Sequence, residues 1–387
     1  MFDVLTLNAI SPRGLARLPA DRYRISADHS APDAVVVRSF DLHGREIPAS
    51  LKAVGRAGAG VNNIPVAAMS ERGIPVFNAP GANANAVKEL VLGGMILACR
   101  RLCPAWEFAR TLEGDDAEVD KAVEAGKKAF AGHELAGRTV AVIGLGAIGR
   151  TVANAAGALG MHAVGFDPGL TVEGASQLSS AVVRVDQLDS AIAGADFVTL
   201  HVPLVDSTRG LINADRIAKM APHTILLNFA RQAIVDEAAV IAALDQDRLD
   251  RYVSDFPVNL TRRHPKCVTL PHLGASTEEA EENCAIMVAD QIREFLEHGN
   301  IRNSVNFPDI SLPRTTTHRV VCASDSLPQL QSQISALCKE AGVAVRGSAT
   351  LSRGDVAYTI VDLDATPPAD ATAKLAATSG VRMVRAI

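Results

Sequence analysis

Short runs of apolar and β-branched residues alternate with polar or helical segments through residues 1–80. Strands that alternate with helices along the chain are typical of a parallel α/β sheet. The expected strands are Val4–Leu7, Ala34–Val37, Leu51–Val54 and Ile74–Phe77, with a helix at Val66–Arg72. From Asn85 to Arg101 the apolar residues fall at helical spacing, which predicts a long, mostly buried helix that leads out of this first domain.

A second alternating series predicts a second α/β unit. Its expected strands are Thr139–Ile143, His162–Phe166, Phe197–Leu200, Thr224–Asn228, Arg251–Ser254 and Cys267–Leu270. After the last strand, Ser276 and Glu279 have the spacing of a capping box. We therefore expect an amphipathic helix to begin there and to run through Phe295.

The pattern breaks between residues 306 and 317, where two prolines and three consecutive threonines favour a linker over a helix. A third, smaller set of elements follows. It consists of a strand at Arg319–Ala323, a helix with Leu330, Ile334, Leu337 and Cys338 on one face, strands around Val343–Val345 and Val356–Val361, a helix near Asp370–Thr378 and a strand from Val381. The order βαββαβ predicts a ferredoxin-like domain.

Composition narrows the class of protein. A chain of 387 residues with 48% hydrophobic and 21% charged residues is expected to fold into two or three domains. Its net charge of -5 argues against a nucleic-acid binder, so small molecules or copies of itself are the expected partners. No apolar stretch is long enough to span a membrane, and the start of the chain resembles a strand rather than a signal peptide. The 6 cysteines lack metal-ligand spacing, which favours reduced thiols in a cytoplasmic protein and no metal site.

The strongest local motif is a glycine turn between a hydrophobic strand and a helical stretch. It comprises Gly144, Gly146 and Gly149, with Ala147 and Ile148 between the last two glycines. Glycines at this spacing allow a tight turn, close approach of the backbone to a pyrophosphate, and packing of helix against strand. The next strand ends at Asp167, whose carboxylate can accept hydrogen bonds from a ribose and repels a 2'-phosphate. The motif therefore predicts NAD rather than NADP.

Three further segments follow strands of the second series, at the position where open α/β sheets bind ligands. They are His201-Val202-Pro203, Asn228-Phe229-Ala230-Arg231 and His272-Leu273-Gly274-Ala275. Together with the glycine turn, these segments resemble the D-isomer-specific 2-hydroxyacid dehydrogenases over about residues 35–305. The resemblance implies an NAD-dependent dehydrogenase in which His201, Val202, Pro203, Phe229, Ala230, Gly274 and Ala275 contact the cofactor.

Oxidation of a hydroxyl-bearing carbon requires a base for the hydroxyl proton and a cation beside the neighbouring carboxylate. His272 suits the base, because imidazole titrates near neutral pH. Arg231 suits the cation, because a guanidinium can bind a carboxylate in a bidentate manner. Each residue taken alone has a structural or surface alternative, and the family resemblance favours the catalytic roles, with both residues also contacting cofactor and substrate.

The family places an acidic residue between this arginine and this histidine, where it orients the imidazole and raises its pKa. Here Asn259 or Leu260 falls at the expected position. Asn259 is the predicted orienting residue, although an amide supplies no negative charge. Asp255 is the nearest carboxylate, and the resemblance assigns it to the nicotinamide ribose or amide, with pairing to His272 as the alternative.

The first domain carries a candidate substrate site. Its residues are Arg38, Ser39, Arg56, Ala57, Gly58 and Asn78, in segments that resemble the substrate loops of phosphoglycerate dehydrogenases within this family. Arg38 and Arg56 follow strands at one edge of the expected sheet, so their charges can converge on a dianionic phosphate. A phosphorylated hydroxy acid is therefore the expected substrate. The alternative for either arginine is that it is a solvated or ion-paired surface residue. The roles of Lys88 and Lys128 stay open.

The resemblance also implies the domain organisation. The expected fold class is α/β, with a flavodoxin-like substrate-binding domain (residues 1–93 and 275–305), a Rossmann NAD-binding domain (residues 94–274), a linker (residues 306–317) and the ferredoxin-like domain (residues 318–387). The first domain is discontinuous because the family's helix after His272 returns to it. Both α/β domains are expected to contain doubly wound parallel sheets.

The C-terminal domain resembles an ACT domain, the regulatory module that often binds serine. Its loop at residues 324–329 lacks glycine, so a serine effector and a purely oligomerising role both stay open. A homodimer or homotetramer is expected. Alternatives on the same scaffold are a hydroxypyruvate or glyoxylate reductase, a phosphoerythronate dehydrogenase, and an NADH-sensing corepressor.

Overall fold

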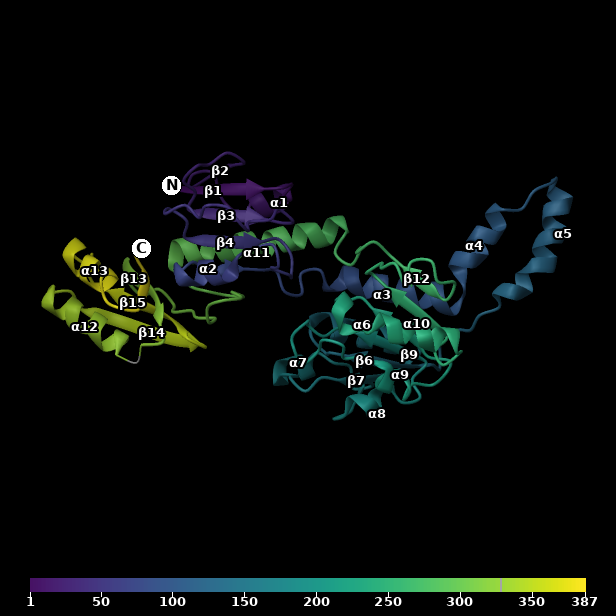
Figure 1. Cartoon of the computed structure of the whole chain (residues 1–387). Coiled ribbons are helices and arrows are strands. Elements are labelled where there is room, and N and C mark those ends of the chain that lie inside the picture. Colours follow the sequence, from purple (N-terminus) through teal and green to yellow (C-terminus); the bar gives the residue numbers. More distant parts are fainter. Residues whose placement is uncertain (328) are drawn as a thin grey trace. The chain divides into compact units, whose positions relative to one another are not determined.

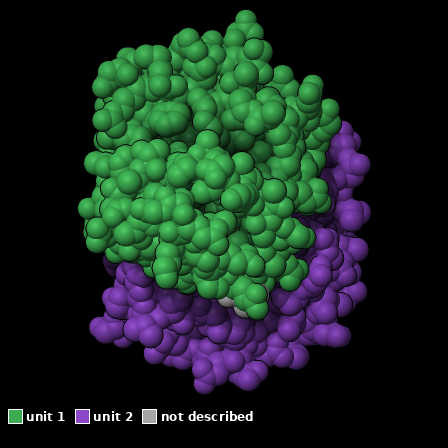
Figure 2. Space-filling model, turned by 90° about the vertical axis from the view of Figure 1, so that its left-hand side faces the viewer, with its two compact units in different colours: residues 1–83, 277–387 green, residues 84–276 purple. Residues whose placement is uncertain are grey.

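The structure, a computed structural model, describes residues 1–327 and 329–387. Its contacts divide the chain into two compact units, residues 1–83 with 277–387 and residues 84–276, which Figure 2 colours separately. The first boundary falls where helix α3 (Ala84–Cys99) begins, and the second falls just before helix α11 (Glu278–His298). The boundary expected at residue 93 therefore lies inside an unbroken helix.

The first unit contains a parallel five-stranded sheet in the order β2-β1-β3-β4-β5. Its strands are β1 (Phe2–Leu7), β2 (Tyr23–Ser26), β3 (Ala34–Val37), β4 (Ala53–Arg56) and β5 (Val76–Phe77), and its shorter helices are α1 (Pro12–Leu15) and α2 (Val66–Glu71). This strand order is that of flavodoxin-like folds, which confirms the prediction. The strand expected to begin at Leu51 begins instead at Ala53, and β2 was not predicted.

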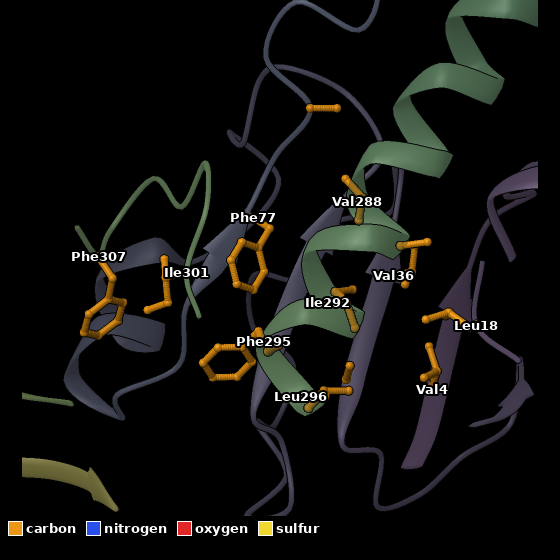
Figure 3. Close-up of a cluster of buried hydrophobic side chains, with 14 of the residues drawn as sticks. Val4, Leu18, Val36, Phe77, Val288, Ile292, Phe295, Leu296, Ile301 and Phe307 are labelled. Carbon is orange, nitrogen blue, oxygen red and sulfur yellow. The ribbon is translucent and has the colours of Figure 1, made fainter. Parts of the chain in front are cut away.

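Helix α11 supplies much of the core beneath this sheet. Its side chains Val288, Ile292 and Phe295 point toward the strands (Figure 3), where Gly55 leaves room for them: a Cβ at Gly55 would lie 2.4 Å from Val288 Cγ1. The helix begins with Thr277, whose hydroxyl accepts the N–H of Ala280 at 3.1 Å. The capping box expected at Ser276 and Glu279 is therefore wrong by one residue, because Thr277 is the residue with the extended backbone that an N-cap requires.

The second unit contains a parallel seven-stranded sheet in the order β12-β11-β10-β9-β6-β7-β8. Its strands are β6 (Thr139–Ile143), β7 (His162–Phe166), β8 (Val183–Arg184), β9 (Phe197–Leu200), β10 (Ile225–Asn228), β11 (Arg251–Ser254) and β12 (Cys267–Thr269). The order is the doubly wound Rossmann arrangement, as predicted, and it is extended by one strand at the β12 edge.

Helices surround this sheet, and two of them project away from it (Figure 1). Besides α3, they are α4 (Leu102–Arg110), α5 (Asp116–Gly126), α6 (Ala147–Ala158), α7 (Val172–Ser176), α8 (Leu188–Ile192), α9 (Ala214–Ile217) and α10 (Glu237–Asp245), with 3₁₀ turns at Lys127–Phe130 and Gln232–Ile234. The projecting pair is α4 and α5, and neither helix contains a buried residue.

The C-terminal elements form the predicted βαββαβ domain. They are β13 (His318–Asp325), α12 (Leu330–Glu340), β14 (Val345–Arg353), β15 (Val356–Leu363), α13 (Ala369–Ala376) and β16 (Val381–Ala386). The strands pair antiparallel in the order β14-β15-β13-β16. A strand was expected at Val343–Val345, and β14 begins at Val345, the last residue of that range.

One face of this C-terminal sheet packs on the first α/β domain rather than facing solvent. Tyr358 and Ile360 of β15 share a hydrophobic cluster with Phe295 of α11 and with Phe307 and Ile310, which lie in the segment expected to be a linker. Phe307 is 0% exposed and Ile310 3% exposed, so residues 306–317 are packed into the first unit.

A buried arginine, paired with an aspartate within the C-terminal sheet, also joins this sheet to the rest of the first unit. The side chains of Arg319 and Asp362 are 0% and 1% exposed, and Arg319 Nε donates to Asp362 Oδ1 at 2.6 Å. Arg319 further donates to the carbonyls of His298 and Leu312 at 2.7 and 2.9 Å. A buried charge requires such a complete set of partners.

Among the residues that the structure describes, none of the helices has the length and apolar character needed to cross a bilayer. All 6 cysteines carry free thiols. In the same described residues, no group of three or more His, Cys, Asp or Glu side chains is arranged to hold a metal ion.

Candidate active site

The predicted cofactor segments lie side by side at the carboxyl edge of the seven-stranded sheet. The last residues of its five adjacent strands are in register, namely Ile143, Leu200, Asn228, Ser254 and Thr269. The residues that follow them, Gly144, His201, Phe229, Asp255 and Leu270, therefore form one row beyond the strands. Open parallel sheets bind their ligands at this edge.

The three glycines of the turn have different geometric requirements. Gly144 has φ +93°, and a Cβ there would lie 2.7 Å from the carbonyl oxygen of His201. A Cβ at Gly149 would lie 1.8 Å from the oxygen of Gly144, so helix and strand approach too closely for any side chain. A Cβ at Gly146 would meet nothing within 4 Å, so its backbone is open to a ligand.

Helix α6 begins immediately after Gly146, with Ala147 and Ile148 as its first residues. The N–H groups at the start of an α-helix have no partner within the helix and carry the positive end of its dipole. Because Gly146 presents no side chain, this helix N-terminus is suited to the pyrophosphate of a dinucleotide.

Asp167 is tied to the same turn from the neighbouring strand. Its half-buried carboxylate accepts the N–H of Leu145 at 2.8 Å and the N–H of Gly169 at 2.8 Å. The acidic side chain therefore lies beside the glycine turn, where the ribose of a dinucleotide is held in Rossmann folds.

His201 lies next to the turn, since its N–H donates to the carbonyl of Ile143 at 2.7 Å. Burial lowers the pKa of His201 to about 3, so the imidazole is neutral at physiological pH. Its Nε2 is 2.9 Å from the hydroxyl of Thr199. Val202 is half-buried and Pro203 is exposed, so the segment turns outward from the sheet edge.

Arg231 is presented at the edge by the buried amide of Asn228. The Asn228 side chain accepts the N–H of Ala230 at 3.2 Å and donates to the carbonyl of Arg231 at 3.0 Å. Phe229 and Ala230 are 7% and 9% exposed and anchor the segment in the core. The Arg231 side chain is exposed and available to an anion.

His272 lies on a loop that Asp255 holds in place. The carboxylate of Asp255 is buried and accepts the N–H groups of Leu273 and Gly274 at 2.8 and 2.9 Å, and the N–H of His272 donates to the Asp255 carbonyl at 3.0 Å. His272 has φ +58°, a conformation that few non-glycine residues adopt without such support. Its exposed ring lies 5.1 Å from the ring of Phe256, measured between centroids.

Burial raises the pKa of Asp255, and the main-chain N–H groups of Leu273 and Gly274 oppose that rise. Each carboxylate oxygen accepts one of these N–H groups, so the carboxylate fixes the loop, and the charge of His272 also opposes the rise in the pKa of Asp255. Gly274 is buried and contacts this carboxylate through its N–H, and Ala275, the next residue in the chain, is half-buried.

The predicted orienting residue, Asn259, is not brought to His272. Asn259 is exposed, and its Oδ1 accepts from Arg262 Nε at 3.0 Å. Within residues 1–327 and 329–387, no hydrogen bond joins Asn259 to His272. The neighbouring Leu260 is 55% exposed.

The predicted substrate residues lie together at the carboxyl edge of the five-stranded sheet in the first unit. Val37, the last residue of β3, is in register with Arg56, the last residue of β4. Arg56 Nε donates to the carbonyl of Arg38 at 3.1 Å. A Cβ at Gly58 would lie 1.9 Å from Arg56 Nη1, so the guanidinium rests over this glycine.

The loops around the two arginines are held by hydrogen bonds to main-chain groups, two of which involve asparagine side chains. The N–H of buried Ala57 donates to the carbonyl of Val37 at 2.8 Å, and Asn78 Nδ2 donates to the carbonyl of Ala59 at 2.6 Å. The N–H of Ser39 donates to Asn8 Oδ1 at 3.0 Å.

Sequence reasoning missed two residues of this first-unit site. Asn8, with φ +71°, shapes the loop at Ser39, and its position directly after a strand is a signal for such a turn. Glu281 forms an ion pair with Arg38, with 2.6 Å between Arg38 Nη1 and Glu281 Oε1. No local sequence signal indicates that pairing, because the two residues come from opposite ends of a discontinuous unit.

Comparison with known proteins agrees with this description. Residues 95–274 match the family described as D-isomer specific 2-hydroxyacid dehydrogenase, NAD binding domain. The D-3-phosphoglycerate dehydrogenase of Haemophilus influenzae is 32% identical over 354 residues, which cover 88% of this chain and 82% of that protein. That of Methanocaldococcus jannaschii is 38% identical over 287 residues, 72% of this chain. The chain spans about half the length of several curated relatives, for example 52% of the Methanocaldococcus jannaschii protein.

Solved structures support the fold. A D-isomer specific 2-hydroxyacid dehydrogenase from Lactobacillus delbrueckii, in its NAD-complexed form, matches with a TM-score of 0.63 and 19% identity, covering 79% of this chain and 100% of that one. The NAD-bound 3-phosphoglycerate dehydrogenase of Entamoeba histolytica matches with a TM-score of 0.60 and 24% identity, covering 79% and 98%. With the match to the Haemophilus protein over most of both chains, these findings show that the chain belongs to the D-isomer-specific 2-hydroxyacid dehydrogenase family.

Proposed function

We propose that the protein oxidises D-3-phosphoglycerate at C2 with NAD, yielding 3-phosphooxypyruvate and NADH, the reaction that opens L-serine biosynthesis. The observation that carries this proposal is the adjacency of Arg38 and Arg56 in a member of this family. Two arginines on adjacent loops of one sheet edge suit a dianionic phosphate better than the uncharged tail of a lactate-type substrate. The curated names of its relatives, including those from Haemophilus influenzae and Methanocaldococcus jannaschii, support the same substrate.

The second unit is proposed to hold the cofactor. Gly146 and the first N–H groups of α6 bind the pyrophosphate, and Asp167 accepts hydrogen bonds from the ribose hydroxyls. NAD, when bound, accepts the hydride from C2 of the substrate. The neutral imidazole of His201 adds no positive charge beside the cofactor.

Two exposed side chains of the same edge are proposed to act on the substrate. Arg231 binds the carboxylate next to C2 and polarises the carbonyl that forms there. A ring nitrogen of His272 takes the proton of the C2 hydroxyl as the hydride leaves, so the proton and the electron pair depart separately. Asp255 keeps His272 in position through the two main-chain N–H groups that follow it.

The direct test is an NADH-formation assay on a panel of acids. We expect the wild type to turn over D-3-phosphoglycerate with a higher kcat/KM than D-lactate, D-glycerate or phosphoerythronate. Arg38→Ala should raise KM for phosphoglycerate about tenfold or more and leave KM for lactate unchanged, because a charge-assisted contact is worth roughly 1.5–3 kcal/mol. Better turnover of lactate, together with no effect of Arg38→Ala, would contradict the proposal.

A second candidate is another dehydrogenase of the same family, such as a hydroxypyruvate or glyoxylate reductase or a phosphoerythronate dehydrogenase. The observation that favours the two reductases, whose substrates carry no phosphate, is the ion pair between Arg38 and Glu281, which offsets one of the two positive charges. Reduction rates with hydroxypyruvate and glyoxylate in the presence of NADH separate these activities from the first proposal.

We also propose that the protein is a homodimer or homotetramer. Helices α4 and α5 contain no buried residue, and Trp106 on α4 is 63% exposed, as expected for a surface that a second copy covers. Light scattering after gel filtration measures the mass, and Trp106→Lys should lower it if this surface is the interface. The free thiols of all 6 cysteines favour a reducing compartment such as the cytoplasm.

The C-terminal domain is proposed to be an ACT-like regulatory module, with serine as a possible effector. Its candidate loop precedes α12 and includes Pro328, which lies outside the described residues. In the described part of this loop, Ser326 N–H donates to the carbonyl of Asp355 at 2.9 Å. Asp355 lies in the turn between β14 and β15, so this turn holds the loop in place. Adding L-serine to the assay separates an effector site from a purely oligomerising module.

A further inference from the structure

Glu281 contacts one of the two arginines proposed to bind phosphate. Its Oε1 lies 2.6 Å from Arg38 Nη1, and the side chains of Arg38 and Glu281 are 31% and 43% exposed. Glu281 belongs to the first turn of α11, which Thr277 caps. The carboxylate is therefore held by a capped helix at the same sheet edge as the arginine.

The two guanidinium groups share an electrostatic environment at this point. Arg56 Nε donates to the carbonyl of Arg38 at 3.1 Å. Burial raises the pKa of the Cys284 thiol, and both Arg56 and Arg38 oppose that rise, so both charges act at one position on α11. Cys284 lies three residues after Glu281, approximately one helical turn along, so Glu281 is also on the side of α11 that faces the arginines.

A carboxylate in this place has chemistry similar to that of the proposed ligand. It is an anion that accepts hydrogen bonds from a guanidinium, as a phosphate does. It pairs with Arg38, and a phosphate that binds both arginines must replace that contact and approach a fixed negative charge.

We propose that Glu281 is a specificity-determining residue that competes with the substrate phosphate for Arg38. This inference rests on the proposed function, because it assumes that Arg38 and Arg56 recognise a phosphate. The carboxylate lowers affinity for a phosphorylated acid without changing affinity for an acid that has no phosphate. It thereby sets how strongly the enzyme prefers its phosphorylated substrate.

The chain offers a matched control in the adjacent residue. Glu282 has the same charge and lies on the same helix, but it pairs with Arg13, with 2.8 Å between Glu282 Oε1 and Arg13 Nε. The Arg13 side chain is 76% exposed and lies outside the proposed phosphate site. Glu281→Gln and Glu282→Gln therefore change the net charge equally, and only the first removes the partner of Arg38.

The experiment measures kcat and KM of both variants and of wild type with D-3-phosphoglycerate and with D-glycerate, the same acid without the phosphate. Glu281→Gln should lower KM for phosphoglycerate about two- to fivefold, which is the range expected for removing a half-exposed ion-pair competitor. KM for D-glycerate and kcat for both acids should stay within the error of wild type. Glu282→Gln should change neither KM.

Several results would overturn the inference. An unchanged or higher KM for phosphoglycerate in Glu281→Gln would mean that the carboxylate has no effect or that it positions Arg38. An equal decrease in Glu282→Gln would mean that only net charge matters. An equal decrease for D-glycerate would mean that Glu281 acts on a part of the substrate other than the phosphate.

A binding measurement separates this inference from the proposed function. Calorimetry of inorganic phosphate with each protein, without NAD, reports on Arg38 and Arg56 whatever reaction the enzyme performs. If wild type does not oxidise phosphoglycerate but phosphate binds more tightly to Glu281→Gln than to Glu282→Gln, the proposed function fails and the competition stands. Equal phosphate affinity in the two variants would contradict the proposal that Glu281 competes with phosphate for Arg38, even if phosphoglycerate is the substrate.

Discussion

The sheet edges of the two units hold their candidate functional groups in different ways. At the seven-stranded sheet, Asp255 is 1% exposed and binds main-chain N–H groups, and Gly149 has no room for a side chain. At the five-stranded sheet, Arg38 pairs with Glu281, and both side chains are partly exposed. The edge proposed to position the reaction is therefore built into the packed backbone, whereas the arginine proposed to bind phosphate is held by a contact that water weakens.

The energetic scales of the two edges differ accordingly. Leaving a buried N–H group without its acceptor costs about 1–3 kcal/mol. A solvent-exposed ion pair contributes about 0–1 kcal/mol. Changes at the first edge should therefore affect folding and catalysis strongly, and changes at the second should affect substrate preference.

The largest effect is expected from His272→Asn. Without the imidazole, no group takes the hydroxyl proton, so kcat should fall by about 10²–10⁴ while NADH binding, followed by fluorescence, is retained. The control is His162→Asn, which changes an exposed histidine at the amino end of β7 and should leave kcat unchanged. A His272→Asn enzyme with more than a tenth of the wild-type kcat would exclude the base role.

Gly149→Ala tests how rigid the glycine turn is. The new Cβ would lie 1.8 Å from the oxygen of Gly144, so the free energy of unfolding, measured in urea, should fall by about 3 kcal/mol and NADH affinity should fall with it. Gly157→Ala on the same helix is the matched control, because its Cβ meets nothing within 4 Å. That variant should be stabilised by about 0.5–1 kcal/mol.

Asp255→Asn distinguishes the two proposed roles of Asp255. An amide nitrogen cannot accept the N–H that a carboxylate oxygen accepts, so stability should fall by about 1–2 kcal/mol and kcat should fall as the His272 loop shifts. If the carboxylate acts mainly by holding the loop through these main-chain N–H groups, the midpoints of the pH–rate profile should be retained. A clear downward shift of the basic group's pKa would instead show that the carboxylate is the electrostatic partner of His272.

The smallest effect is expected from Asn259→Ala. Its exposed side chain contacts Arg262 rather than His272, so kcat should stay within about twofold of wild type and stability within about 0.5 kcal/mol. A tenfold loss of kcat would restore Asn259 as the residue that orients the imidazole and would mean that the loop rearranges when ligands bind.

The strands that the sequence predicted correctly differ physically from those that it did not reveal. β6, β7, β9 and β11 have the predicted bounds, because each is a short stretch with buried apolar residues flanked by turns. β2 and β8 were missed because both are short edge strands; β8, for example, has two exposed residues and no apolar run. Helices α4 and α5 gave no core pattern because they bury no residue.

The site divides in a similar way. The glycine turn, Arg231 and His272 were predictable, because each follows a recognisable strand and the register of parallel strands aligns their ends. The positions of Asn259 and Glu281 were not predictable. The contact of Asn259 depends on how its loop folds, and that of Glu281 depends on which helix packs on the first sheet. The residues next to them in the sequence do not indicate either arrangement.

The packed segment between α11 and β13 also constrains how such proteins can recombine. Phe307 and Ile310 fill the seam against Tyr358, and Arg319 reaches the carbonyls of His298 and Leu312 across it. A chimera whose junction lies within residues 306–317 would combine this packed segment from one parent with a C-terminal sheet from another. The two surfaces would then not be complementary. Natural or engineered exchange of the C-terminal module should therefore succeed only when the segment from residue 299 onward is inherited as one piece with it.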